Sequence, residues 1–227
     1  MNTEMSRKTL LRRELLAARR LLTEEDVKSA AAVLSRTASG LPELSGARTV
    51  AAYVSVGSEP GTRTLLDALR ARGVRVLLPV LLPDNDLDWG VYEGADRLVR
   101  AGRGLLEPGG ERLGRDAVLA ADAVLLPGLA VDAHGMRLGR GGGSYDRVLA
   151  RLAAAGAHPA LVVLLYDDEV VARVPAEPHD HPVDVVVTPA AIRRTGRGAD
   201  RTGSGAGPAA GHPVIGRPAA GGTDPTV

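Results

Sequence analysis

The sequence predicts an α/β fold with three layers, in which helices cover both faces of a mostly parallel sheet. Two observations support this class. Short apolar runs alternate along the chain with stretches of helical periodicity. Several of these runs are apolar at nearly every position, which is typical of parallel strands that are buried on both faces. The chain has 227 residues, and we expect a single domain over residues 1–194.

The first two elements are predicted to be helices. Residues 7–22 carry Leu and Ala at helical spacing and are charged throughout, which indicates an amphipathic helix and not a secretory signal. Thr23 is followed by three acidic residues, the pattern of a helix N-cap with an acidic first turn. The second helix is expected to end near Ser39, because Gly40 and Pro42 then interrupt the pattern.

The apolar runs that follow are predicted to be strands. They comprise residues 49–56, 74–78, 87–92, 121–126, 160–166 and 183–188. A helix over residues 62–72 separates the first two and is closed by Gly73, and another helix is expected to begin near Tyr145. Ligands of such sheets bind outside the carboxyl ends of the strands, so we expect the functional residues in the loops at that edge.

The C-terminal residues are predicted to be a disordered tail. From Thr195 to the end, Gly and Pro fill 13 of 33 positions, and no apolar periodicity is present. Residues 191–227 contain five Arg and two Asp, a net charge of +3, whereas residues 1–190 contain 23 basic and 25 acidic residues, a net charge of −2. The predicted domain is therefore slightly acidic.

Composition excludes several classes of function. A formal net charge of +1 and an aromatic content of 2% disfavour a nucleic-acid-binding protein. The absence of Cys excludes a disulfide framework, a thiolate zinc site and a Cys nucleophile, and it fits a reducing compartment. No apolar run approaches the roughly 18 residues of a membrane span. We expect a cytoplasmic monomer with neither a nucleic-acid nor a membrane partner.

The segment from residue 124 to residue 151 carries the strongest chemical signal. A buried strand ends at Pro127, and a glycine-rich loop follows that reads Arg137-Leu-Gly-Arg-Gly-Gly-Gly-Ser-Tyr-Asp146. Glycines let backbone N–H groups turn toward a ligand, and a helix N-terminus just beyond favours an anion. Arg137 and Arg140 add positive charge, and Asp146 offers a hard oxygen suited to Mg²⁺. The loop matches neither a Walker loop nor a dinucleotide fingerprint. Its glycines alone would also fit a flexible linker, an alternative that the flanking strand and helix, the two Arg residues and Asp146 disfavour.

Three weaker signals accompany this loop. Glu59 lies between a predicted strand and a predicted helix, where it either binds an amine-rich ligand or is a solvated loop acid. His179 and His181 flank Asp180; alternate residues of an extended chain point apart, so Asp180 is the better candidate for a metal ligand. Lys8 and Arg12 lie four residues apart on one helix face, which by itself indicates a solvated basic face. Arg19 and Arg20 are also assigned to a solvated face.

Together and in this order, these segments resemble the 5-formyltetrahydrofolate cyclo-ligase family over residues 8–190. The most specific part is P-G-L-A-x-D-x-x-G-x-R-L-G-R-G-G-G-x-Y-D-R, from Pro127 to Arg147. An early K-x-x-x-R, an E-x-x-T from Glu59 to Thr62 and a late H-D-x-x-V-D from His179 to Asp184 accompany it. The resemblance implies a fold like that of sugar-phosphate isomerases. It also implies ATP-dependent closure of 5-formyltetrahydrofolate to 5,10-methenyltetrahydrofolate, with release of ADP and phosphate.

The resemblance also implies roles for individual residues. Arg140 and Tyr145 would be catalytic, Asp146 and Asp180 would hold Mg²⁺, and the folate would contact Tyr53, Glu59 and Gly142. ATP would be bound by the two helical cations and the glycine-rich loop: Lys8, Arg12, Arg137, Leu138, Gly139, Arg140, Gly141, Gly142, Gly143, Ser144 and Tyr145.

This chain departs from the family pattern at two positions. Many members carry an aromatic residue where this chain has Ser144, and another where it has Val131. If the first aromatic packs on the pterin, Ser144 weakens folate binding unless Trp89 or Tyr53 compensates. Ser144 thus leaves open a relative that binds nucleotide or folate without catalysis. The expected fold leaves open a second alternative, a sugar-phosphate isomerase that uses Glu59 or Asp132 as a base.

Overall fold

The computed structural model describes residues 2–177 and 180–195. The predicted tail, from residue 196 onward, lies outside the described residues, as does His179. Thr195, which the sequence analysis placed first in the tail, instead belongs to the domain: its side chain is buried and its amide donates to the carbonyl of Asp184. No helix in the described part of the chain has the length and apolar character needed to cross a membrane.

The helices begin where the sequence provides caps. Thr23 accepts from the amide of Asp26, and the carboxylate of Asp26 accepts from the amide of Thr23, which is the predicted N-cap in its reciprocal form. Gly73, at φ +81°, follows the end of the helix that precedes it, as expected. The α-helices are α1 (Asn2–Arg19), α2 (Glu24–Ser39), α3 (Pro42–Ser45), α4 (Arg63–Ala71) and α5 (Ser144–Ala154); the short 3-10 helices are η1 (Ala95–Arg97), η2 (Gly102–Gly104), η3 (Arg115–Ala120) and η4 (Asp167–Glu169).

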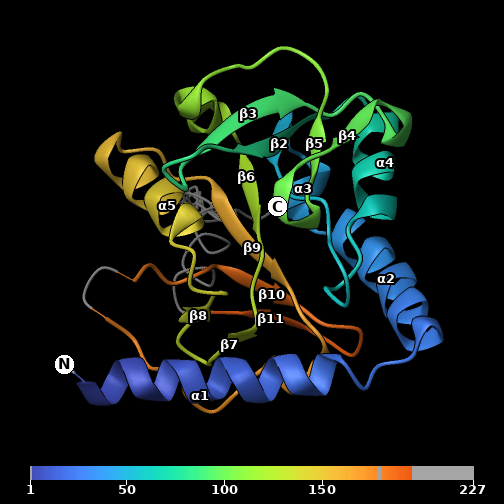
Figure 1. Ribbon diagram of the computed structural model, residues 1–227. Helices are drawn as coiled ribbons and strands as arrows, with labels where there is room; N and C mark the ends of the chain where they lie inside the picture. Colours follow the sequence, from blue (N-terminus) through green and yellow to red (C-terminus); the bar gives the residue numbers. More distant parts are fainter. Residues whose placement is uncertain (1, 178–179, 196–227) are drawn as a thin grey trace, which may run out of the picture.

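A seven-stranded sheet with the order β11-β10-β9-β6-β1-β2-β3 forms the middle of the molecule (Figure 1). Its inner strands run parallel, and only β3 and β11, at the two edges, pair antiparallel to their neighbours. The strands are β1 (Thr49–Ala51), β2 (Arg75–Leu81), β3 (Leu87–Val91), β6 (Ala123–Leu126), β9 (Ala160–Leu164), β10 (Val185–Val187) and β11 (Ile192–Arg194).

Helices cover both faces of this sheet, which confirms the predicted three-layer α/β/α class (Figure 1). Alternation along each strand explains the two cores: Val50 packs toward α2, α3 and α4, whereas its neighbour Ala51 packs toward α5 and η3. The side chain of Trp89, in β3, lies in the second core and is fully buried.

Two small antiparallel pairs stand outside the main sheet, and the sequence analysis missed both. One pair is β4 (Leu98–Arg100) with β5 (Leu106–Pro108), and the other is β7 (Ala130–Val131) with β8 (Arg137–Leu138). Helix α1 lies across the end of the molecule near β7 and β8 (Figure 1). Leu11 and Leu15 of α1 pack there on a small apolar cluster that includes Ala130 and Leu138.

The predicted strands lie where expected, but several of their ends differ. The run 74–78 was expected to stop at Pro79, whereas β2 continues through Pro79 to Leu81. Two other strands end earlier than expected. The run 49–56 forms a strand only to Ala51, and the run 160–166 only to Leu164. The residues beyond these ends turn away at the carboxyl edge of the sheet, where Tyr53 and Tyr166 face other loops. Apolar character continued past the strand because these loop residues are buried as well. The extra residues therefore form the predicted functional edge of the sheet.

Candidate functional site

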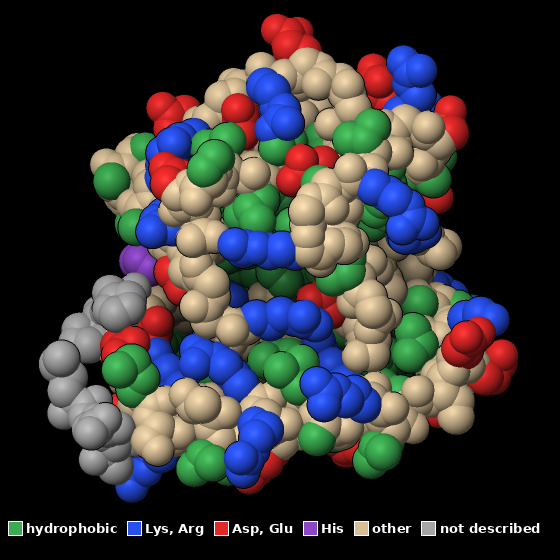
Figure 2. Space-filling model, in the orientation of Figure 1, with side chains coloured by type: hydrophobic (Ala, Val, Ile, Leu, Met, Phe, Trp, Pro, Cys, Tyr) green, Lys and Arg blue, Asp and Glu red, His purple; other side chains and the backbone are tan. Residues whose placement is uncertain are grey.

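A cavity of about 310 Å³ opens at this carboxyl edge. Figure 2 shows a hollow in this face, with apolar side chains inside it and Lys and Arg side chains along its rims. Tyr53, after β1, and Pro127, after β6, form part of the floor. The β2–β3 strands, the β4–β5 hairpin and the glycine loop 139–143 form the walls. The cavity therefore lies where the topology predicted a ligand.

The glycine loop needs its glycines for conformation and for space. Gly141 and Gly143 have φ angles of +92° and +75°, a region that disfavours side chains. A Cβ atom on Gly139 would lie 2.7 Å from a guanidinium nitrogen of Arg137. Gly143 is the N-cap residue of α5 and has no side chain to satisfy the first amides of that helix. The first amides of α5 therefore have no side-chain cap, and the residues that carry them line the cavity.

The Arg137 guanidinium is held by contacts with other residues of the protein. One guanidinium nitrogen donates to the carbonyl of Pro127 at 3.0 Å, and another lies 2.8 Å from the carboxylate of Asp146. Burial lowers the pKa of Arg137, and the charge of Asp146 opposes that shift. The group remains a cation, because a guanidinium does not deprotonate in proteins. Its Nε atom has no hydrogen-bond partner among the described residues.

Lys8 and Arg12, the two predicted cations of α1, contact residues next to the cavity. The Lys8 ammonium lies 2.9 Å from the carboxylates of both Glu177 and Asp180. Burial alone would lower the pKa of Lys8, but the hydrogen bonds to Asp180 and Glu177 raise it above its ordinary value. Arg12 donates from Nε to the carbonyl of Gly139 at 2.9 Å. Both side chains thus contact the segments assigned to ATP and Mg²⁺, although neither lines the cavity itself.

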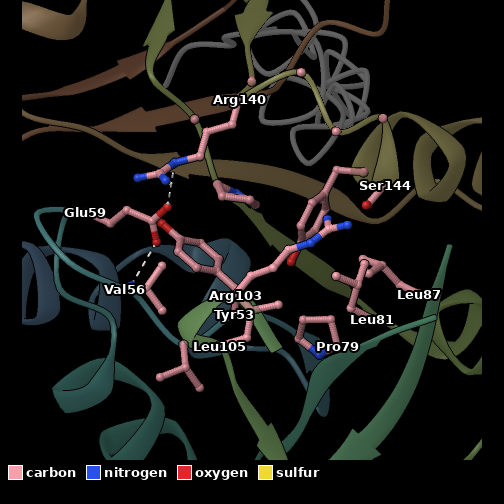
Figure 3. A pocket seen from close by; sticks show the side chains of 18 of the residues that line it. Tyr53, Val56, Glu59, Pro79, Leu81, Leu87, Arg103, Leu105, Arg140 and Ser144 are labelled. Atoms are coloured by element: carbon pink, nitrogen blue, oxygen red, sulfur yellow. Dashed lines mark hydrogen bonds and ion pairs between the residues drawn. The ribbon is translucent and has the colours of Figure 1, made fainter. Parts of the chain in front are cut away.

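Glu59 and Arg140 form an ion pair across the cavity mouth (Figure 3). Arg140 Nε lies 3.2 Å from one carboxylate oxygen of Glu59. The other oxygen accepts the amide of Val56 at 3.0 Å, which fixes the carboxylate in the loop after β1. The Arg140 side chain is half exposed and the Glu59 side chain is buried, so Glu59 is the fixed partner and Arg140 the movable one.

Tyr53 and Tyr145 line the cavity as protonated phenols. Burial raises the pKa of both hydroxyls, and the negative charge of Glu59 raises it further. Tyr145 is therefore a hydrogen-bond donor at neutral pH and not a base. Its buried hydroxyl has no hydrogen-bond partner among the described residues, so it is an unused donor in a residue that lines the cavity.

Asp146 and Asp180 are suited to a shared hard cation, although each now has a cationic partner. Asp146 lines the cavity and pairs with Arg137, whereas Asp180 pairs with Lys8. The charges of both carboxylates raise the pKa of Arg137, against the lowering by burial, so both act on the same guanidinium. Across residues 2–177 and 180–195, no cluster of three or more His, Asp or Glu side chains forms a complete metal site. Two carboxylates with phosphate and water oxygens match the preference of Mg²⁺.

Some of the other predicted site residues line the cavity, and some do not. The glycines 139 and 141–143 and Ser144 line the cavity. Leu138 does not, because its side chain is buried in the small cluster under α1. Trp89 cannot replace the missing family aromatic, because it is fully buried in the core. Tyr53, the other suggested replacement, lines the cavity.

Sequence reasoning missed the wall formed by the β4–β5 hairpin. Arg103, Leu105 and Glu107 line the cavity from this hairpin. Figure 3 shows the Arg103 side chain extended into the cavity. The only local signal was Gly-Arg-Gly at residues 102–104, a turn pattern in which Arg103 itself has a φ of +59°.

The prediction for Arg19 was wrong. Its side chain, assigned to a solvated face, is buried in an ion pair with Glu169, whereas Arg20 is exposed as expected. The signal that could have found it is the spacing on α1. Lys8, Arg12 and Arg19 follow one another at four and seven residues and therefore share one helix face.

Known proteins match this chain over nearly all of the described region. A curated relative from Mycolicibacterium smegmatis, "5-formyltetrahydrofolate cyclo-ligase", is 45% identical over 80% of this chain and 93% of its own length. The Escherichia coli K12 protein of the same name is 32% identical over 77% of this chain and 96% of its own length.

Solved structures agree on the fold. The 5,10-methenyltetrahydrofolate synthetase of Aquifex aeolicus superposes with a TM-score of 0.70 at 28% identity, covering 90% of this chain and 96% of its own. A synthetase of that name from Mycoplasma pneumoniae reaches 0.63 at 19% identity, over 80% and 98%, and this likeness supports the fold alone.

The family assignment follows from the match of the full motif series as well as from these relatives. The model of the 5-formyltetrahydrofolate cyclo-ligase family matches residues 4–189, which include the glycine loop, Glu59, the α1 cations and Asp180. The predicted family, the predicted enzyme class and the predicted fold are thereby confirmed. This chain belongs to the 5-formyltetrahydrofolate cyclo-ligase family.

Proposed function

We propose that this cavity converts 5-formyltetrahydrofolate to 5,10-methenyltetrahydrofolate, using ATP and Mg²⁺ and releasing ADP and phosphate. One observation carries the assignment of the site: a single cavity joins a glycine loop, which Arg12 and Arg137 contact and which carries Arg140, to a buried carboxylate, Glu59. The loop suits a polyanion, and the carboxylate suits the amine-rich pterin.

The polar end of the cavity is the proposed triphosphate site. Backbone N–H groups of residues 139–143 and the start of α5 would face the phosphates, and the Arg140 guanidinium would leave Glu59 to join them. Phosphoryl transfer depends on positioning and on neutralising charge, and a loop of this kind supplies both. Asp146 and Asp180 would hold Mg²⁺, which when bound would neutralise part of the phosphate charge.

The apolar part of the cavity is the proposed folate site. Pro79, Leu81 and Leu87 form one wall, and Leu105 lies on another (Figure 3). Leu106 of the same hairpin also lines the cavity. Flat apolar walls with a few placed polar groups are typical of sites for heterocycles. Glu59, held by the amide of Val56, would accept hydrogen bonds from the pterin amine.

The chemistry needs no protein nucleophile. The formyl oxygen attacks the γ-phosphorus of ATP, the bond to ADP breaks, and an N5-iminium phosphate forms. N10 then attacks the former formyl carbon, its proton is lost, and inorganic phosphate leaves. Tyr145, protonated and without a partner among the described residues, would donate a hydrogen bond to an oxygen in transfer. Arg140 would stabilise the charge that develops there.

The test is the appearance of the methenyl product, followed by its absorbance, when the protein is mixed with 5-formyltetrahydrofolate, ATP and Mg²⁺. ADP should form in equal amount, and omission of ATP should stop the reaction. Binding of ATP or folate without turnover at high enzyme concentration would instead favour the non-catalytic relative. The family assignment leaves the isomerase alternative without support. A cytoplasmic location and a monomeric state stay predictions from the sequence.

A further inference from the structure

Arg19, the last residue of α1, is buried without being part of the cavity wall. Its side chain is 2% exposed, and that of Glu169 in η4 is 4% exposed. The guanidinium meets the carboxylate with two hydrogen bonds, Nε to Oε1 at 2.5 Å and Nη2 to Oε2 at 2.9 Å. A bidentate arrangement fixes orientation as well as distance. The two side chains therefore hold the end of α1 in one position against η4.

The same pair is bonded to the loops that form the site. Nη2 of Arg19 also donates to the carbonyl of Gly128, a residue of the cavity wall, at 2.8 Å. Glu169 accepts the amide of Tyr166 at 3.0 Å, and the Tyr166 hydroxyl donates to the carbonyl of Ser58, next to Glu59, at 3.2 Å. The Tyr166 ring also lies 5.7 Å from the guanidinium carbon of Arg19, within cation–π range.

Helix geometry links this anchor to the cations at the other end of α1. Arg12 lies seven residues before Arg19 and Lys8 eleven, which places all three on one face. At about 1.5 Å per residue, Arg12 is roughly 10 Å and Lys8 roughly 16 Å along the axis from the anchor. A small rotation of α1 at Arg19 would therefore displace both cations from the glycine loop and from Asp180.

We propose that the Arg19–Glu169 pair is a positioning device for ATP binding: it sets the rotation of α1, and hence the places of Lys8 and Arg12, relative to the loop 139–143. The inference rests on the proposed function in taking ATP as the ligand. Neither residue touches the nucleotide, and both act through the α1 cations and the wall at Gly128.

Because the Arg19–Glu169 pair is buried, its effect on folding stability can be distinguished from its effect on the position of α1. Removing one partner leaves an uncompensated buried charge, which destabilises the fold, whereas removing both charges together often restores stability. Restored stability does not restore the bidentate geometry. A double substitution therefore gives different outcomes for a structural pair and for a positioning pair.

The experiment compares Arg19→Met, Glu169→Gln and the double variant, with Arg20→Met as the matched exposed control on the next residue. Gln at 169 keeps an oxygen for the amide of Tyr166. Melting temperature, the ATP dissociation constant by calorimetry, and KM and kcat are measured for each. We expect Arg19→Met to weaken ATP binding by about tenfold and to raise the KM for ATP more than it lowers kcat. Arg19→Lys should recover part of the ATP affinity, since lysine restores the positive charge but not the bidentate hydrogen bonding of the guanidinium.

The double variant distinguishes a positioning role of the pair from a purely structural one. We expect its melting temperature to return toward that of the wild type while its ATP affinity stays weak. Recovery of ATP affinity together with stability, or wild-type affinity in Arg19→Met, would overturn the inference. A wild-type protein that binds ATP but forms no methenyl product would refute the proposed function and leave this inference standing; no ATP binding by the wild type would refute both.

Discussion

At the scale of single residues, the cations and carboxylates of the site are already paired with one another. Lys8 is bound to Asp180, Arg137 to Asp146, and Arg140 to Glu59. A triphosphate and a metal ion would exchange these partners: phosphate oxygens would take the cations, and Mg²⁺ would take the carboxylates. Each ligand alone must break the pairs without the compensation that the other provides, so the two should bind cooperatively.

Asp146→Asn tests this exchange. We expect turnover to fall by at least about 100-fold, because an amide is a poor ligand for a hard cation. Affinity for ATP without Mg²⁺ should be equal to or above that of the wild type, since a negative charge beside the phosphates is removed, and Mg²⁺ should no longer strengthen ATP binding. Calorimetry with and without a chelator measures both affinities, and Asp96→Asn, at an exposed position, is the control. Loss of Mg²⁺-free ATP binding would contradict the exchange.

Ser144→Tyr tests the family aromatic that this chain lacks. Ser144 lines the cavity and is only partly exposed, so a ring at this position would lie against the proposed folate site. An aromatic contact contributes about 0.5–1.5 kcal/mol, so the KM for 5-formyltetrahydrofolate should fall about twofold to twelvefold. Steady-state kinetics with Ser144→Ala as the control would reveal this, since Ala adds no ring. An unchanged or higher KM in the tyrosine variant would mean that the aromatic does not pack on the substrate here.

At the scale of elements, the glycine loop and the start of α5 act as one unit, and Gly143→Ala probes it. Gly143 and Gly156, at φ +75° and +64°, precede and follow the same helix, and both have open space around the missing Cβ. Alanine at either position should cost about 1 kcal/mol of folding free energy through backbone strain. Only Gly143→Ala should also raise the KM for ATP, because only that position faces the cavity. Equal ATP kinetics in the two variants would remove Gly143 from the phosphate site.

Elements were predictable from sequence where one local signal determined them. The cap at Thr23 and the stop at Gly73 depend on neighbouring residues, and both appear as expected. The hairpin that carries Arg103 and Glu107 was not predicted, because its strands are short and its placement depends on contacts with β2 and β3. Arg19 escaped for a similar reason: its buried partner, Glu169, lies 150 residues later in the chain. Local patterns thus located the glycine loop that lines the cavity, and long-range contacts decided the rest of the cavity wall.

At the scale of the whole molecule, Asp86 joins three elements around the second core. Its carboxylate lies 2.7 Å from Arg151 of α5 and 2.9 Å from Arg115 of η3, and it precedes β3. The hydrogen bond from Arg151 lowers the pKa of Asp86 below its ordinary value, although burial opposes the shift. A carboxylate with a lowered folded pKa stabilises the fold above its unfolded pKa of about 3.9 and loses that contribution as the pH falls through the folded value.

Asp86→Asn should therefore flatten the acid limb of the stability curve. At pH 7 we expect the variant to be less stable than the wild type by about 2 kcal/mol, because charge-assisted hydrogen bonds are lost. Between about pH 5 and pH 2 the difference should shrink, since the wild type protonates the same group. Urea unfolding across this range measures the effect. A constant difference at all pH values would show that protonation of Asp86 does not contribute to acid unfolding.

The burial of Trp89 has a practical consequence for all of these measurements. It is the one tryptophan of the chain, and it lies fully buried in the core between the sheet and α5. Its intrinsic fluorescence therefore reports on a single apolar environment, and the emission should shift to longer wavelength when water reaches the indole. Because Leu87, two residues earlier in the same strand, lines the cavity, the emission can also register changes there on ligand binding. The residue that cannot contact the folate is thus an optical probe of the wall beside it.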